Sequence, residues 1–418
     1  MTVPIQLVLY LSVGAIGPTV AWLLVRSLDF VSVLADWSLY QIVLANLLTW
    51  YALGRLRSYA RARLLSYVLP VNVITFGTVL GLNALARTGF SWTLLLPCAF
   101  ATLAVSYLVT ARIRHANPNL RHYIVPGGDI GSILGRQGFL QLGSADELND
   151  LIARKLVTGS VVADLHDEKA PEWERAIARA ALSGVPVYHY RLIEEELTGE
   201  VRINHLREND LGSLIPNLPY RTVKRAIDIA GAMVLMPVLL PLMAIIALLI
   251  RMDGAGPIIF RQERLGYRGE NFTMVKFRTM RERVVSDHDD ARRDDAITRD
   301  SDDRITRVGG FLRKTRLDEL PQVWNILKGD MSWIGPRPEA RALADWYEAE
   351  IPFYAYRHIV RPGITGWAQV NQGHVAGIDD VHTKLRFDFY YVKNLSLWLD
   401  ILIALKTLRV IVSGIGAK

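Results

Sequence analysis

Four apolar runs near the start of the chain restrict its fold more than any other feature of the sequence. Each run is close to the roughly 20 residues that cross a bilayer as a helix. The runs are Val3–Val25, Leu39–Gly54, Leu64–Ala86 and Phe90–Ala111. The first run has neither the basic start nor the small-residue cleavage site of a signal peptide, so we expect it to be retained. The sequence therefore predicts a bundle of four transmembrane helices in residues 1–115.

The composition agrees with a membrane protein that has a large soluble part. Hydrophobic residues make up 51% of the chain and charged residues only 21%. The net charge of +7 suits an anionic lipid surface or a phosphate-bearing substrate. Nucleic acid is the competing partner, but no nucleic-acid motif supports it, so we expect none. The single cysteine, Cys98, excludes an intramolecular disulfide and a cysteine metal cluster.

Arginines between the apolar runs predict the orientation of the bundle. The loop after the second run and the segment after the fourth are both rich in arginine: Arg55, Arg57, Arg61 and Arg63 in the first, and Arg112, Arg114 and Arg121 in the second. Basic loops stay in the cytoplasm. The N-terminus and everything beyond Arg112 are therefore expected on the cytoplasmic face.

Short apolar strands then alternate with amphipathic helices, which predicts a small parallel, Rossmann-like α/β domain in residues 116–206. The expected strands are His122–Pro126, Gly138–Leu142, Val161–Leu165 and Val185–Tyr190, and the expected helices are Asp146–Leu156 and Pro171–Ser183. The turn Pro126–Gly131 suggests a dinucleotide site, but its glycine spacing is degenerate and the helix that should begin there is interrupted by further glycines. We therefore expect a structural or regulatory domain, followed by a linker over residues 207–220.

A fifth apolar run, Ile229–Ile250, is long enough to cross the membrane but has basic residues on both sides. Both flanks are therefore expected in the cytoplasm. The run contains Pro237 and Pro241, and proline bends a helix. We predict a re-entrant helix over residues 224–251 that bends near Pro241 and leaves on the side it entered; an ordinary span is the alternative. The last apolar segment, Leu395–Ile415, carries charges along its length, which predicts a helix in the plane of the interface.

The residues that follow the fifth run hold the densest set of reactive side chains. Asp318 and Glu319 are adjacent, with Arg313, Lys314 and Arg316 just before them. Two adjacent acids alone favour a solvated helix face over a catalytic site. A carboxylate near several cations stays ionised, however, and can attack phosphorus or hold a divalent metal. The stretch within residues 281–304 mixes acids with arginines, and it is interpreted as a solvated loop, because a charge run does not show the convergent geometry of a metal site.

Several strings within the last 195 residues carry a specific resemblance. They are Lys224-Arg225 with Asp228, the apolar run with Pro241, the Lys276 segment, Arg313–Gln322, Gly335–Pro338 and Arg361–Asn371. Residues 221–418 resemble the bacterial sugar transferase family, the monotopic polyprenyl phosphate phosphoglycosyl transferases. The preceding bundle and α/β domain resemble the family's larger members. The resemblance implies a mainly α catalytic domain with a re-entrant helix, at the cytoplasmic face of the bacterial inner membrane.

The resemblance also implies an activity and a site. The expected enzyme transfers a sugar 1-phosphate from a UDP-sugar to undecaprenyl phosphate, releases UMP, and begins capsule, O-antigen or exopolysaccharide synthesis. Asp318 would be the nucleophile that forms a covalent phosphosugar intermediate, and Glu319 would assist. Mg²⁺ would be the cofactor, with Asp318 as its ligand. Candidate phosphate contacts are Lys276, Arg313, Arg337 and Arg361.

Two other functions remain open from the sequence. One is a membrane glycosyltransferase that passes only the sugar and releases UDP. The other is a non-catalytic membrane scaffold or regulator of polysaccharide assembly. No residue set identifies the sugar, and the non-catalytic half of the chain suits a homodimer as well as a monomer.

Overall fold

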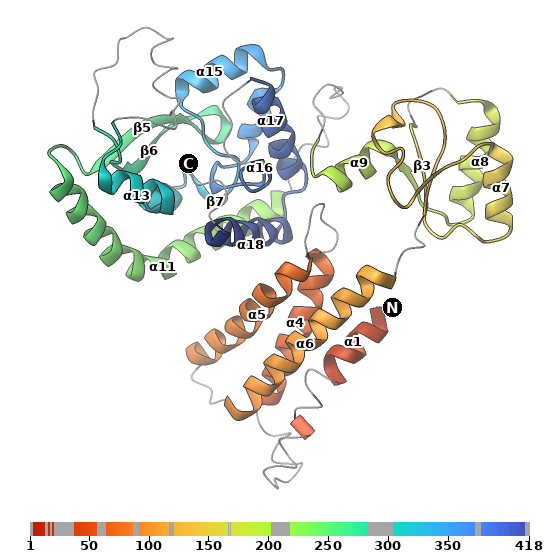
Figure 1. The fold of residues 1–418 in the computed structure, drawn as a ribbon, viewed down its shortest axis with the longest axis horizontal. Coiled ribbons are helices and arrows are strands. Elements are labelled where there is room, and N and C mark those ends of the chain that lie inside the picture. The colour runs from red at the N-terminus through yellow and green to blue at the C-terminus, as the bar shows by residue number, and fades with distance from the viewer. Residues whose placement is uncertain are drawn as a thin grey trace. The chain divides into compact units, whose positions relative to one another are not determined.

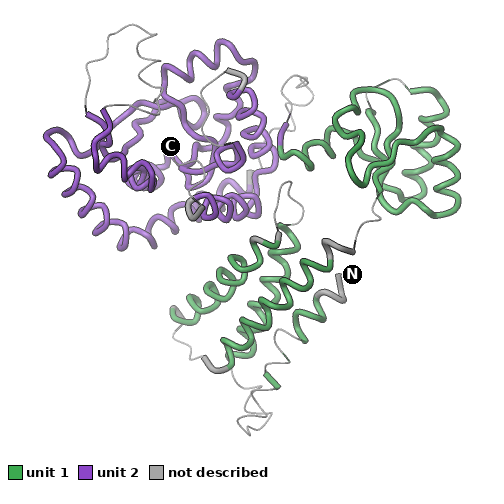
Figure 2. The backbone as a smooth tube through the Cα atoms, viewed as in Figure 1, with its two compact units in different colours: residues 1–199 green, residues 200–418 purple. Residues whose placement is uncertain are grey.

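The computed structural model describes residues 3–12, 16, 19–20, 37–56, 64–86, 92–116, 121–165, 167, 169–201, 218–281, 304–372 and 378–413. Two compact units divide the chain, residues 1–199 and residues 200–418 (Figures 1 and 2). The protein is mainly helical, with one four-stranded parallel sheet and two small two-stranded sheets. Three segments that carried predictions lie outside the described residues. They are the loop arginines at positions 57, 61 and 63, the acid-rich stretch 282–303, and most of the predicted linker.

The first unit begins with apolar helices that lie side by side in Figure 1. They are α1 (Val3–Leu11), α4 (Trp37–Leu56), α5 (Leu64–Ala86) and α6 (Trp92–Ala116). Ile42, Phe76 and Leu94 form part of their shared core. Many other apolar side chains face outward, among them Phe100, which is 70% exposed. Apolar surface of that kind is expected where lipid replaces water.

Within the described residues, three helices are long and apolar enough to cross a membrane: α5, α6 and α11 (Leu218–Asp253). The described part of α1 has nine residues, which is less than half the length a span needs. The chain is therefore a membrane protein, while the crossing of all four N-terminal helices and the side on which each loop lies stay predictions.

The α/β part of the first unit has strand order β2-β1-β3-β4, all parallel. Its elements are β1 (His122–Ile124), η2 (Ile130–Ser132), β2 (Phe139–Gln141), α7 (Ala145–Ala153), β3 (Ser160–Ala163), α8 (Pro171–Leu182), β4 (Val187–His189) and α9 (Tyr190–Thr198). The expected strands and helices all form, each slightly shorter than expected. After β1 the chain makes only the short turn η2, so no helix N-terminus faces the glycine turn as a dinucleotide site would require.

The second unit packs helices around two small sheets. Its elements are α11, β5 (Ile259–Leu265), η5 (Tyr267–Gly269), β6 (Asn271–Phe277), α13 (Arg307–Thr315), η6 (Leu317–Gln322), α14 (Val323–Lys328), β7 (Ser332–Ile334), α15 (Arg341–Glu350), η7 (Tyr354–Ile359), β8 (Gly363–Thr365), α16 (Trp367–Asn371), α17 (Ile378–Lys393) and α18 (Leu397–Ser413). Strands β5 and β6 form an antiparallel hairpin, and β7 and β8 pair in parallel. α11 begins three residues before residue 221, within the linker predicted from the sequence.

Helix α11 contacts this unit along both of its halves and curves round one side of it (Figure 1). Its first half packs through Ala232 against the hairpin and α14, and its second half packs through Ile246 and Ile250 against Phe277 and Leu312. Both Pro237 and Pro241 lie inside it. Its other face exposes apolar side chains such as Val234, at 76%, and Val238, at 68%. One helix thus joins a protein core to a surface that suits lipid.

Candidate active site

The two adjacent acids occupy a short 3₁₀ turn between two helices. α13 ends at Thr315, and Arg316 then takes a left-handed backbone conformation with φ 56°. A side chain other than glycine is uncommon there. The chain reverses at this residue and enters η6, where Asp318 and Glu319 form the first turn and Pro321 fixes the next. After the reversal η6 packs against β6, and Glu319 contacts Lys276 of that strand.

Glu319 is buried and surrounded by cations. It is 7% exposed, and its Oε1 lies 3.3 Å from Lys276 Nζ and 3.3 Å from Arg337 Nη1. Its Oε2 lies 4.0 Å from Arg316. Burial on its own would raise the pKa of this carboxyl, but Lys276, Arg337 and Arg316 outweigh burial and hold the pKa at about 2. Glu319 is therefore a fixed anion.

Asp318 differs from its neighbour in its contacts and in the direction of its pKa shift. Among the residues that the structure describes, none donates a hydrogen bond to its carboxylate or forms an ion pair with it. Burial first, and then the charge of Glu319, raise the pKa of Asp318, while Lys276 and Arg337 partly oppose the rise. The expectation that neighbouring cations keep an acid ionised thus describes Glu319 better than Asp318, because the cations contact Glu319. Asp318 keeps its oxygen atoms available for a substrate.

Lys276 reaches Glu319 from β6, and Asn325 holds that strand in place. The Asn325 side chain accepts a hydrogen bond from Val275 N at 3.1 Å and donates one to Thr273 O at 2.8 Å. A buried amide that satisfies two backbone groups of one strand fixes that strand relative to α14. Because α14 directly follows η6, the same contacts set the position of Lys276 relative to the acids.

Arg337 comes from the loop between β7 and α15, and a buried ionic network holds this loop. Arg357 donates to the carbonyl of Arg337 at 2.9 Å and pairs with Asp388 at 2.8 Å. The side chains of Arg357 and Asp388 are each 2% exposed. Arg264 donates to the carbonyl of the next residue, Pro338. The sequence did not indicate this network, because its members are widely separated along the chain.

The other predicted site residues lie at varying distances from this centre. Arg313, in the last turn of α13, contacts the sulfur of Met280 and acts on Asp318 through its charge. Arg361 is not brought to the acids by any contact described. It donates to the carbonyl of Gly329 at 2.9 Å and lies over the ring of Tyr267. Lys276, Arg337 and Asp318 thus form one cluster with Glu319, and Arg361 belongs to another.

A divalent metal fits this cluster only when a phosphate group of the substrate supplies some of its ligands. Within the described residues, no group of three or more histidine, cysteine or acidic side chains gathers as a metal cage would require. Mg²⁺, however, is usually bound by one or two carboxylates together with substrate phosphates and water. The oxygen atoms of Asp318, which no described residue pairs with, could bind such an ion, whereas the cations around Glu319 make a permanently bound ion unfavourable.

Comparisons with known proteins match the chain to one family and to several relatives. A family profile described as bacterial sugar transferase matches residues 219–414. The UDP-N-acetylgalactosamine-undecaprenyl-phosphate N-acetylgalactosaminephosphotransferase of Aeromonas hydrophila is 43% identical over 90% of this chain and 86% of its own length. The UDP-glucose:undecaprenyl-phosphate glucose-1-phosphate transferase of Xanthomonas campestris pv. campestris is 33% identical over 73% of this chain and 67% of its own. Because it covers 90% of this chain, the alignment with the Aeromonas relative extends beyond the family match into the first unit.

Proposed function

The chain belongs to the bacterial sugar transferase family, and from that premise we propose that it transfers a sugar 1-phosphate from a UDP-sugar to undecaprenyl phosphate. One observation carries the proposal: Asp318 has no partner among the described residues and lies next to Glu319, whose charge Lys276 and Arg337 balance. N-acetylgalactosamine is the proposed sugar, because the Aeromonas relative acts on it by name and aligns with 90% of this chain.

The first half of the reaction forms a bond between Asp318 and phosphorus. A carboxylate oxygen of Asp318 attacks the phosphorus that carries the sugar, and the bond from that phosphorus to the bridging oxygen breaks. UMP leaves with the bonding electrons, and the sugar phosphate remains on the aspartate as an acyl phosphate. Lys276 and Arg337 are placed to offset the charge that builds on the phosphoryl oxygens.

In the second half, an oxygen of undecaprenyl phosphate attacks the same phosphorus. The bond between phosphorus and Asp318 breaks, the carboxylate is restored, and undecaprenyl diphosphate sugar is the product. We propose that Mg²⁺ accompanies the donor, held by Asp318 and the donor's phosphates; when bound, it supplies charge neutralisation of the diphosphate. Glu319 keeps Lys276 and Arg337 oriented toward the phosphates.

Trapping the intermediate tests the nucleophile. The purified protein would be mixed with UDP-N-acetylgalactosamine without acceptor, quenched in acid and digested. We expect the peptide that contains Asp318 to gain the mass of a sugar phosphate, one UMP to be released per adduct, and Asp318→Asn to abolish both. Asp345→Asn, at an exposed carboxylate of α15, is the matched control. Normal turnover without an adduct at Asp318, or release of UDP in place of UMP, would contradict the proposal.

We further propose that α11 enters the inner leaflet of the cytoplasmic membrane and returns to the cytoplasmic side. The support is that both ends of the helix bind the same unit. Near the start, Asp228 accepts hydrogen bonds from Ser332 and from Trp333 N. At the end, Arg278 donates to the carbonyls of Gly254 and Ala255. A helix that crossed the bilayer would place its two ends on opposite sides.

Labelling of single cysteines tests this topology in a background where Cys98 is replaced by serine. Asp150 lies before α11 in the sequence and Lys328 after it, and their side chains are 71% and 63% exposed. If α11 is re-entrant, Asp150→Cys and Lys328→Cys react with a membrane-impermeant maleimide from the same side, the cytoplasm. Reaction from opposite sides would establish that α11 crosses the membrane, and would leave the proposed chemistry untouched.

A further inference from the structure

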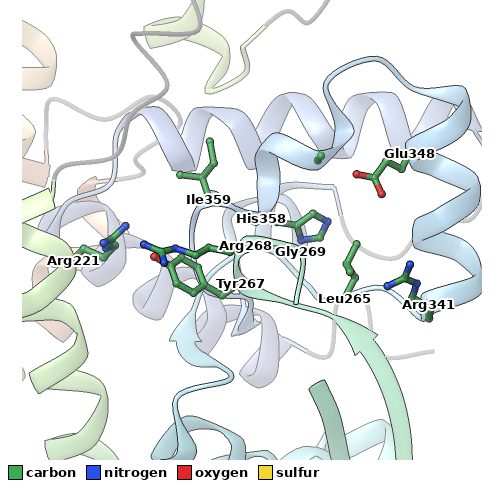
Figure 3. Close-up of a pocket in the computed structure, with 10 residues that line it drawn as sticks. Arg221, Leu265, Tyr267, Arg268, Gly269, Arg341, Glu348, His358 and Ile359 are labelled. Atoms are coloured by element: carbon green, nitrogen blue, oxygen red, sulfur yellow. The ribbon is translucent and has the colours of Figure 1, made fainter. Parts of the chain in front are cut away.

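A second cationic site lies at the opposite end of the β5–β6 hairpin from Lys276. A cavity of about 590 Å³ opens between the hairpin turn η5, the first turn of α11, α15 and η7 (Figure 3). Its charged lining residues are Arg221, Arg268, Arg341 and Glu348. Lys276 and the hairpin turn lie at opposite ends of β6, and neither acid of η6 lines this cavity.

Three arginines contact one tyrosine ring at one side of the cavity. The guanidinium carbons of Arg221, Arg268 and Arg361 lie 5.7, 5.1 and 5.0 Å from the centroid of the Tyr267 ring. Each distance is within the range of a cation–π contact. In Figure 3, Arg221 and Arg268 lie beside Tyr267, whereas Arg341 and Glu348 lie at the other side. The two sides of the cavity therefore differ in charge.

The side of Arg341 is neutralised by acids, and the side of Tyr267 is not. Arg341 pairs with Asp345 at 2.8 Å and is also near Glu348. Among the described residues, neither Arg221 nor Arg268 pairs with a carboxylate. Arg361 donates to a backbone carbonyl rather than to an acid. Burial and the charges of Arg225 and Arg221 lower the pKa of Arg361, as expected for cations that crowd together.

A buried histidine nitrogen adds a second indication of a ligand. His358 lines the same cavity and is 7% exposed, and its Nε2 has no hydrogen-bond partner among the described residues. Burial and the neighbouring Arg357 lower the pKa of His358 to about 3, so the imidazole is neutral. A buried polar nitrogen without a partner is costly, and a polar atom of a ligand would remove that cost.

We infer that this cavity binds a phosphate group, held by Arg221 and Arg268 beside Tyr267, with His358 bonded to another polar atom of the same ligand. Guanidinium groups match phosphate oxygens in charge and geometry. The site goes beyond the proposed transfer reaction and needs none of its residues. Arg221 lies two residues before the exposed apolar Val223 of α11, which places the cavity near a surface that suits lipid. The phosphate group therefore has two sources: an anionic phospholipid at the interface, or a soluble nucleotide.

Native mass spectrometry of the full chain in detergent tests the site with two probes, phosphatidylglycerol and UMP, and with phosphatidylcholine as the uncharged reference. The variant Arg221→Gln with Arg268→Gln is compared with Arg154→Gln, which removes an exposed arginine of the first unit. Loss of even one charge-assisted hydrogen bond weakens binding about tenfold. We expect the double variant to bind at least one probe about tenfold more weakly than Arg154→Gln does.

The two arms distinguish the sources. A loss confined to phosphatidylglycerol identifies a lipid headgroup, and a loss confined to UMP identifies a free phosphate. Arg268→Gln alone, at an exposed position in η5, provides a second variant with an expected loss of the same direction and a check that its unfolding temperature is unchanged. If folded variants retain both probes as well as Arg154→Gln does, the inference is wrong, whatever the result at Asp318.

Discussion

The two adjacent acids have different roles in the site because their surroundings differ. Glu319 binds the cations, which fixes its charge and theirs, whereas no group in the described part of the chain pairs with the oxygen atoms of Asp318. Burial and the charge of Glu319 both raise the pKa of Asp318. A carboxylate with a raised pKa is a better nucleophile once it is ionised, because basicity and nucleophilicity rise together.

This arrangement predicts how turnover depends on pH. Asp318 must be anionic to attack, so activity is lost as the pH falls through its pKa, and we expect the midpoint above the usual 3.8. Glu319→Gln removes a repelling charge and frees Lys276 and Arg337 to interact with Asp318. The midpoint should therefore move to lower pH, while the rate falls about a hundredfold or more because the cations lose their orientation. UMP release measured from pH 4 to 8 (roughly the range where carboxylates with raised pKa titrate) checks both effects, and an upward shift would contradict them.

The buried pair of Arg357 and Asp388 leads to a prediction about stability. Asp388→Asn removes the nearer of the two acids that face the buried Arg357 guanidinium, the other being Glu339 at 4.0 Å; breaking a buried pair typically costs about 3–5 kcal/mol of unfolding free energy. Asp345→Asn breaks an exposed pair with Arg341 and should cost less than about 1 kcal/mol. Denaturant unfolding of both variants in the same detergent measures the difference. Equal losses would mean that the buried network does not hold the Arg337 loop.

The sequence indicated the central acids but not the groups that position them. Asp318 and Glu319 are conspicuous because basic residues stand beside them in the chain. Arg357 and Asp388 meet only after α17 packs against η7, and local sequence contains no sign of such a contact. The same reason explains Arg361: a single residue in a motif does not reveal which of two cationic clusters it joins.

At the scale of elements, α11 is the part in which local sequence and tertiary contacts agree most closely. Apolar composition predicted a helix over residues 224–251, and the structure extends it to Leu218–Asp253. The parallel sheet of the first unit was predictable as well, because alternating strands and helices leave few other arrangements. α9 was not expected, since no helix was predicted between the strand Val185–Tyr190 and the linker over residues 207–220.

Prolines in α11 lead to a prediction about topology. If Pro237 and Pro241 favour the bend, replacing both with leucine should straighten the helix and favour a full crossing. Lys328→Cys would then be labelled in part from the periplasmic side. Pro70→Leu, a matched change inside α5, should leave the labelling unchanged. Unaltered labelling in the double variant would mean that the contacts of the two helix ends, rather than the prolines, determine the path of α11.

At the scale of the whole molecule, the candidate chemistry belongs to one of the two units. The described partners of the acidic pair, Lys276, Arg316 and Arg337, all lie in residues 200–418. The first unit has hydrophobic clusters of its own. Its parallel sheet therefore has a stable core without being part of the acidic centre, as a structural or regulatory domain would.

This division predicts that a fragment of residues 200–418 releases UMP from its donor at a rate within about tenfold of the full chain, a difference of about 1.4 kcal/mol. Membranes that contain the fragment, and membranes that contain the fragment with Asp318→Asn, would be assayed with the same UDP-sugar. A fragment that inserts and folds yet releases no UMP would mean that the first unit contributes to catalysis.

The pairing of β7 with β8 leaves no space between their two backbones at the glycines. A Cβ atom on Gly335 would lie 2.2 Å from the carbonyl oxygen of Arg361, and one on Gly363 would lie 2.1 Å from the nitrogen of Gly335. The backbone of the loop that contains Arg337 thus packs directly against the backbone of the turn that contains Arg361. A chimera that takes one of these segments from a relative must take the other from the same relative, since neither backbone can shift to fit a segment of different shape.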